Sequence, residues 1–162
     1  MSLGSNVVCV REHMGWEHPE FLYRFVPAGA SEAERRRYRD SLYSLEARKQ
    51  RTSWILTRML PVLRISADTL QSDDLTGQTP DGLTALRERY AGPPMDPLTV
   101  LVNRLCDGAI PTPDEYETAM AQATKAGQQE RVTRLLEGIP AERDKWLREA
   151  KARRVNHRRS HL

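Results

Sequence analysis

Two proline-aspartate pairs, Pro80-Asp81 and Pro113-Asp114, lie 33 residues apart, and each opens a stretch with helical periodicity. In both stretches the first helix is predicted to end at a turn that contains glycine, and a leucine-rich second helix follows. A repeat period in the thirties with two helices per unit is typical of a helical solenoid. One hairpin cannot bury both of its apolar faces, whereas stacked hairpins share a core. We therefore expect residues 80–147 to form two stacked helical hairpins.

The rest of the chain also predicts helices. A capping box begins at Ser31, and apolar residues recur three and four positions apart from Tyr38 onward, which indicates a long helix over 31–65. Pro61 should end or kink that helix. No stretch shows sustained strand alternation. The predicted fold is all-α: a short α-solenoid of stacked helical hairpins with an N-terminal arm and a long helix.

Composition divides the chain into five predicted parts. The first 30 residues are rich in aromatic residues and broken by prolines and glycines, so we expect at most one short helix there. A polar, acidic stretch precedes the hairpins and predicts a linker, and Pro140 should break the last hairpin helix. The predicted parts are an extended aromatic arm (1–30), an N-terminal helix (31–65), a linker (66–79), two hairpins (80–147) and a basic C-terminal tail (148–162).

Basic charge is concentrated at the C-terminal end. The formal net charge is +3, but residues 148–162 hold six Lys and Arg against one acidic residue, which leaves the rest of the chain at −2. A domain that reads nucleic acid would be expected to carry a basic stripe on its folded body. A basic tail can bind phosphates, an acidic protein groove or anionic lipid, or can stay solvated. The residues predicted to bind a partner are Arg153, Arg154, Arg158 and Arg159.

A second group of arginines lies in the first turns of the 31–65 helix, where positive charge opposes the helix dipole. A solvated helix face and a contact with an acidic partner are both open interpretations. The group consists of Arg35, Arg36, Arg37 and Arg39.

Motifs for catalysis, metal binding or membrane insertion are missing from the sequence. The four-residue gap between His13 and His18 matches no closed zinc pattern, and the chain has no P-loop, nucleophile elbow or dinucleotide fingerprint. Cys9 and Cys106 are too few and too far apart for a disulfide framework. The longest apolar stretch, around residues 54–63, is far shorter than the roughly 20 residues of a membrane span. We predict no enzyme, no cofactor, no metal, no small-molecule substrate and no membrane span.

The second predicted hairpin resembles a pentatricopeptide repeat. The matching positions are Tyr116 in the first turn, Met120 four residues later, the Lys125-Ala126-Gly127 turn, and the apolar positions Val132, Leu135, Leu136 and Ile139. The first hairpin resembles the repeat only weakly, and a tetratricopeptide-type or generic helical hairpin is the alternative. The resemblance implies an organellar protein, and on that basis we expect the mitochondrial matrix.

Most pentatricopeptide proteins bind RNA and read one base per repeat through a few side chains. The position after the tyrosine, where the family usually has Asn, Ser or Thr, is Glu117 here, and the companion positions fall near Leu147 and Thr112. Leucine cannot hydrogen-bond a base, and a carboxylate faces a polyanion even where it could accept from a cytosine amine. RNA binding, or association with the mitochondrial ribosome, is therefore the second hypothesis.

Two non-catalytic subunits of mitochondrial complexes are also similar to this chain. The segment Ile110-Pro111-Thr112-Pro113, followed by Ala119 and the 134–137 stretch, resembles the helical matrix-side subunit Va of cytochrome c oxidase. Size and helical layout are similar to a pentatricopeptide-like subunit on the catalytic head of protist ATP synthase. These resemblances imply a structural or adaptor subunit of an ATP synthase or respiratory-chain complex. Such a subunit binds partner proteins through its helical-repeat surface and terminal extensions.

Overall fold

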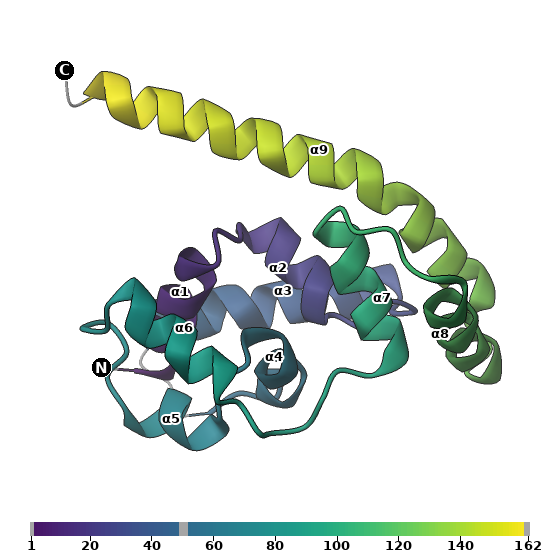
Figure 1. Ribbon diagram of the computed structural model, residues 1–162, viewed down its shortest axis with the longest axis horizontal. Coiled ribbons are helices and arrows are strands. Elements are labelled where there is room, and N and C mark those ends of the chain that lie inside the picture. The colour runs from purple at the N-terminus through teal and green to yellow at the C-terminus, as the bar shows by residue number, and fades with distance from the viewer. Residues whose placement is uncertain (1, 49–51, 161–162) are drawn as a thin grey trace.

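The computed structural model describes residues 2–48 and 52–160, and helices are its only regular secondary structure in those ranges, which confirms the all-α class. Figure 1 shows α1 to α6 gathered in one part of the molecule, α7 and α8 beside them, and α9 running across the body toward the C-terminus. The helices are α1 (Leu3–His13), α2 (His18–Phe25), α3 (Glu32–Ala47), α4 (Leu56–Leu63), α5 (Ala67–Ser72), α6 (Pro80–Glu88), α7 (Pro97–Cys106), α8 (Pro113–Lys125) and α9 (Gln129–Ser160).

Two hydrophobic clusters form the core. The first is built by α1 to α6, and its fully buried side chains include Phe21, Phe25, Leu42, Met59 and Leu63. The second is built by α7 to α9, and its buried side chains include Leu101, Ala119, Val132, Ile139 and Trp146. Burial of large apolar side chains contributes about 1.5–3 kcal/mol each, so both clusters stabilise the fold substantially.

The clusters are joined by α2 and α7. The Arg24 guanidinium donates to the side chains of Asn103 at 3.3 Å and Asp107 at 2.7 Å. The Asn103 amide returns a hydrogen bond to the Arg24 carbonyl at 3.0 Å. Arg24 is only 3% exposed and its hydrogen bonds with Asn103 are buried, whereas the Asp107 side chain is 60% exposed.

The predicted extended arm over 1–30 is wrong for residues 2–30, because they form α1 and α2 and pack both helices into the first cluster. Ser2 caps α1, a signal that the sequence interpretation did not use. Gly4 lets α1 cross α3 closely, since a Cβ atom at this position would lie 1.9 Å from the Leu45 carbonyl oxygen. Each helix is short, so the apolar period of α1 covers only three buried positions, Leu3, Val7 and Val10.

The predicted helix over 31–65 is two helices. Ser31 caps α3 as predicted, accepting the Glu34 N–H at 3.2 Å, but α3 ends at Ala47 and α4 begins at Leu56. The sequence from 48 to 53 contains no apolar side chain, so nothing there can hold a continuous helix onto the core. Pro61 lies inside α4 and does not end it.

The predicted linker over 66–79 contains α5 and two fully buried leucines, Leu70 and Leu75. Buried Asn6 on α1 holds this segment by donating to the carbonyls of Leu70 at 2.8 Å and Asp73 at 2.6 Å. Its side-chain oxygen accepts the Leu75 N–H at 3.0 Å. The acidic composition predicted a linker, but buried Asn6 fixes residues 70–75 against α1.

The two predicted hairpins differ in the structure. Helix α6 packs on α1 and places Leu83 in the first cluster, whereas α7 packs on α2, α8 and α9 in the second. The first predicted hairpin is thus divided between the clusters. In the second, α8 packs on α9, an arrangement compatible with stacked helical hairpins. The Thr112 capping box begins α8, as the sequence predicted a helix start there.

Pro140 does not break the last helix, contrary to the prediction, and residues 148–160 continue α9 rather than forming a separate tail. Proline removes the N–H that would bond to the Leu136 carbonyl and crowds that carbonyl, which usually bends or ends a helix. Here Ile139 and Trp146, buried on either side of the proline, hold both parts of α9 to the second cluster. Figure 1 shows α9 as one curved helix.

Candidate functional site

The C-terminal part of α9, residues 147–160, leaves the core and is called the α9 extension. Trp146 is the last buried residue among those whose side chains the structure describes, and from 147 to 155 every side chain is exposed except the half-buried Ala150. Leu147 and Val155 are 62% and 43% exposed. Residues 147–155 of the α9 extension therefore expose basic and apolar side chains to solvent.

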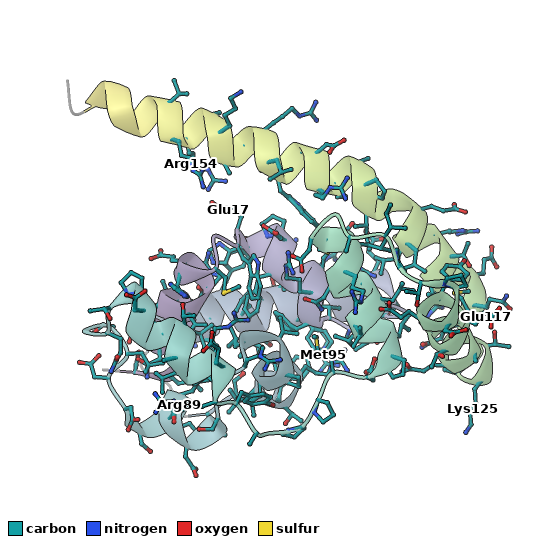
Figure 2. All side chains as sticks on the ribbon, in the orientation of Figure 1. Glu17, Arg89, Met95, Glu117, Lys125 and Arg154 are labelled. Atoms are coloured by element: carbon teal, nitrogen blue, oxygen red, sulfur yellow. The ribbon has the colours of Figure 1, made fainter. Side chains whose placement is uncertain are left out.

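The predicted partner-binding arginines lie on this extension. Arg153 forms an ion pair with Glu17 of the body at 2.6 Å, although its side chain stays 54% exposed. Arg154 is exposed and has no hydrogen bond or ion pair with any residue in the described ranges. The side chains of Arg158 and Arg159 lie outside the described part of the chain. Figure 2 shows Glu17 on the body facing the extension that carries Arg154.

A cavity of about 430 Å3, the α9 cavity, opens where the extension meets α2 and α3. Its lining holds both signs of charge, because Glu17 and Glu149 lie near Arg153. Its lining residues are Glu17, His18, Pro19, Tyr43, Glu149, Ala152 and Arg153.

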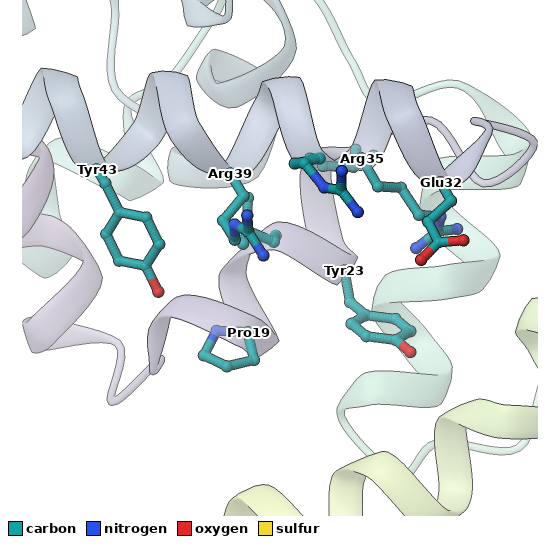
Figure 3. Close-up of a pocket in the computed structure, with 9 residues that line it drawn as sticks. Pro19, Tyr23, Glu32, Arg35, Arg39 and Tyr43 are labelled. Carbon is teal, nitrogen blue, oxygen red and sulfur yellow. The ribbon is translucent and has the colours of Figure 1, made fainter.

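A second cavity, the α2–α3 cavity, lies between α2 and α3 and has a volume of about 340 Å3. Figure 3 shows Arg35, Arg39 and Tyr43 extending from α3 toward α2, which presents Pro19 and Tyr23. Pro19 and Tyr43 line both cavities, so the two adjoin. The lining of the α2–α3 cavity is Pro19, Leu22, Tyr23, Val26, Glu32, Arg35, Arg36, Arg39 and Tyr43.

Arg35 is the most enclosed cation of the α2–α3 cavity. Its guanidinium donates to the Ala28 carbonyl at 3.3 Å and lies 5.7 Å from the centroid of the Tyr23 ring. Burial lowers the pKa of Arg35, and the nearby Tyr23 only partly opposes that shift. Burial also raises the pKa of Tyr23, with Glu142 adding to the rise, so the phenol stays neutral near pH 7. The guanidinium is thus partly deprived of water and has no carboxylate partner among the described residues.

The other arginines of the predicted group divide between two surfaces. Arg36 and Arg39 line the cavity and are exposed. Arg39 makes long contacts of 3.4 Å with Asp40, whereas Arg36 has no polar partner within the described residues. Arg37 instead lies over the Trp54 ring, 5.4 Å from its centroid. The sequence identified the group, but not which members face a cavity or that α2 supplies the other wall.

The positions that would read a base in a pentatricopeptide repeat do not form a polar pair. Thr112 uses its hydroxyl to accept the Glu115 N–H at 3.2 Å and so caps α8. Glu117 is exposed on α8, and Leu147 is exposed on the α9 extension (Figure 2 labels Glu117). Tyr116 is 47% exposed and lines an apolar cavity with Pro111.

The described residues offer little for covalent or metal chemistry. Both cysteines are free, and burial raises the pKa of Cys106 to about 12, although Arg24 opposes that rise. A thiol with this pKa is not a thiolate nucleophile near neutral pH. No three His, Cys, Asp or Glu side chains within the described ranges are grouped to hold a metal ion. In the same ranges, no helix combines the length and apolar character that crossing a bilayer requires.

Comparison with known proteins returns no similar protein. No family model, no curated protein and no solved structure matches this chain.

Proposed function

We propose that the protein is a non-catalytic adaptor subunit that binds a partner protein through the exposed basic end of α9. The main observation behind this proposal is that α9 continues after Trp146 with exposed side chains that do not pack on the core. The helix continues for 14 further residues to Ser160, about 21 Å at 1.5 Å per residue. An isolated helix of this length is marginally stable in water, so a partner that covers it would stabilise it.

The exposed side chains fit a protein partner. The α9 extension carries Arg153 and Arg154 beside exposed Leu147 and Val155. Protein interfaces combine apolar anchors, which provide most of the affinity, with charges that fix the register. The predicted site residues Arg158 and Arg159 belong to the same proposed surface.

We further propose that the partner belongs to a large mitochondrial assembly of the matrix, an ATP synthase or a respiratory-chain complex. The support is the pentatricopeptide-like pattern of α8 and the first part of α9, together with the resemblance to non-catalytic subunits. Helical subunits of this kind act through their surfaces.

RNA binding is the alternative, because the same arginines could contact phosphates. Charge argues against it: Glu149 lies on the extension and Glu17 beside it, and the chain before residue 148 has a net charge of −2. An RNA backbone that followed the extension would bring its phosphates close to these carboxylates, and the repulsion would weaken binding.

The test is affinity purification of the tagged full chain from its native source, with and without nuclease. We compare Arg154→Glu, which breaks no hydrogen bond or ion pair within the described residues, with the control Arg89→Glu/Lys125→Glu at the C-cap of α6 and on α8. Figure 2 labels both control positions, and both are exposed. We expect stoichiometric protein partners whose recovery does not change with nuclease. Their recovery should fall at least about tenfold with Arg154→Glu and should not fall with the control.

Three results would contradict the proposal. Partners that disappear with nuclease, or that are ribosomal, would replace the adaptor function with the RNA hypothesis. Partners that the control variant loses equally would show a general effect of charge. The absence of any stoichiometric partner would remove the adaptor function itself.

A further inference from the structure

We infer that the α2–α3 cavity binds an acidic segment of a partner protein, with an apolar side chain in the cavity and carboxylates on Arg35, Arg36 and Arg39. This inference rests on the proposed adaptor function but assigns a different surface, on α2 and α3 rather than on the α9 extension.

The apolar part of the cavity defines one half of the ligand. Helix α2 presents Pro19, Leu22, Tyr23 and Val26 to the cavity. A volume of about 340 Å3 is at the lower end of the range for small-molecule sites, about 300–1,000 Å3. A cavity of this size fits the anchor residue of a peptide, since hot-spot side chains fill small pockets while neighbouring residues exclude water.

The charges of the cavity define the other half. Arg35 has lost part of its hydration, and within the described residues its guanidinium donates only to the Ala28 carbonyl. Arg36 has no polar partner within the described residues, and the contacts of Arg39 with Asp40 are long. A guanidinium in this situation gains from a carboxylate, which it can bind through two parallel N–H groups. The three arginines outnumber the single acid of the lining, Glu32.

The distribution of charge favours a peptide over a nucleic acid. The adjoining α9 cavity carries Glu17 and Glu149, and Glu32 lies at the arginines themselves. A peptide can place acidic residues on the arginines and neutral or basic residues near these carboxylates. RNA carries a phosphate at every nucleotide and cannot avoid them. Tyr23 and Tyr43 therefore serve as apolar walls rather than as platforms for stacked bases.

The test is a selection of random dodecapeptides displayed on phage, with the purified full chain as the target. Arg36→Glu/Arg39→Glu is the test variant, since both side chains are exposed and α3 does not need them for packing. Arg89→Glu/Lys125→Glu is the control with the same change in charge. Selected peptides are synthesised with a fluorescent label and titrated by anisotropy, and a labelled oligouridylate is titrated in parallel.

We expect the selected peptides to combine acidic residues with a large apolar residue and to bind the test variant at least about tenfold more weakly than the control. Replacing the acidic residues of the peptide by lysine should restore binding to Arg36→Glu/Arg39→Glu. Such a charge exchange identifies direct contact, which a folding defect cannot imitate.

Other outcomes would overturn the inference. Peptides without acidic residues, or equal binding to both variants, would show that the arginines do not recognise the ligand. Tighter binding of the oligouridylate, lost in the test variant, would assign the cavity to RNA. Self-association of the chain that depends on Arg36 and Arg39 would assign it to a second copy.

The native purification separates this inference from the proposed function. If Arg154→Glu loses the native partner and Arg36→Glu/Arg39→Glu keeps it, the adaptor function stands and the cavity is not part of the interface. If neither variant loses a partner and no acidic peptide is selected, both proposals fail.

Discussion

The arginines inside the fold and the arginines on its surface differ in what lies opposite them. Arg24 is 3% exposed and donates to Glu20, Asn103 and Asp107. Arg36 and Arg154 are exposed and have no polar partner within the described residues. An arginine side chain therefore joins elements of the fold at position 24, whereas at positions 36 and 154 it is available to a partner. The difference depends on neighbours that are distant in the sequence.

Half-buried Arg58 and buried Arg11 join helices in the same way. Arg58 on α4 donates to the Phe25 carbonyl at 3.0 Å and to the Thr99 hydroxyl at 3.2 Å, which connects it to α2 and α7. Arg11 on α1 forms an ion pair with Glu46 of α3 at 2.9 Å, with both side chains less than a tenth exposed. A buried ion pair is costly to break because the remaining partner keeps an uncompensated charge.

The largest effect is expected from Arg24→Met, which keeps an apolar stem and removes the guanidinium. Glu20 and Asn103 would lose a buried partner, and the junction between the two clusters would weaken. We expect the free energy of unfolding to fall by about 2–4 kcal/mol, because buried polar groups would be left unsatisfied. The measurement is urea unfolding followed by circular dichroism.

Arg89→Met is the control for this change. Arg89 is exposed, and its guanidinium donates to the Ala85 carbonyl of the preceding turn, so the loss of free energy of unfolding should be within about 0.5 kcal/mol. Equal losses in the two variants would contradict the distinction between internal and surface arginines.

The sequence predicted the elements that local signals define. The helix starts predicted at Ser31, Pro80-Asp81 and Pro113-Asp114 agree with the structure, because Ser31, Thr79 and Thr112 each cap a helix through nearby backbone N–H groups. The sequence-based prediction was wrong for segments whose structure depends on tertiary contacts. Asn6 holds the 70–75 segment across more than 60 residues, and no local pattern reveals such a pairing.

The candidate site was predictable only in part. The arginine run of α3 and the basic α9 extension are visible in the sequence as clusters of charge. The α2–α3 cavity was not, because Pro19 and Tyr23 belong to a segment that was expected to be an extended arm. Once that segment folds as α2, it supplies the apolar wall opposite the arginines.

A pH-dependent effect is expected above pH 9 from Cys106, because burial holds its thiol protonated near internal Arg24. Burial raises the pKa of Cys106 from 9.0 to about 12, so the unfolded chain loses this proton at lower pH than the folded chain does. The stability that follows is fully present below pH 9 and is lost as pH rises toward 12. The loss can reach about 1.4 kcal/mol per pH unit within that window.

The measurement is the free energy of unfolding at several pH values from 8 to 11 for the native chain and Cys106→Ala. The variant has a pH-independent loss from the missing sulfur, but its stability should decline less steeply with pH. Parallel slopes would mean that the thiol is not held protonated. In Arg24→Met the native pKa should rise further, because Arg24 now lowers it. Alkylation of Cys106 in that variant should therefore be slower at a given alkaline pH while the fold persists.

The smallest effect on stability is expected from Arg153→Ala, which removes the ion pair between the α9 extension and Glu17. Both side chains are substantially exposed, so the global free energy of unfolding should change by less than about 0.5 kcal/mol. The local effect on the extension is larger, because residues 147–155 include no buried side chain that would hold them to the body. Amide hydrogen exchange in residues 147–155 should therefore become faster, whereas exchange in α7 should not change.

Arg154→Ala is the matched control, since Arg154 neighbours Arg153 but has no polar partner within the described residues. High salt should accelerate exchange of the extension in the native chain, by screening the Arg153–Glu17 pair, and should have little effect in Arg153→Ala. Equal exchange in the two alanine variants would show that the ion pair does not hold the extension. Arg153 would then be as available as Arg154, and both of these arginines could bind a partner without first breaking an internal contact.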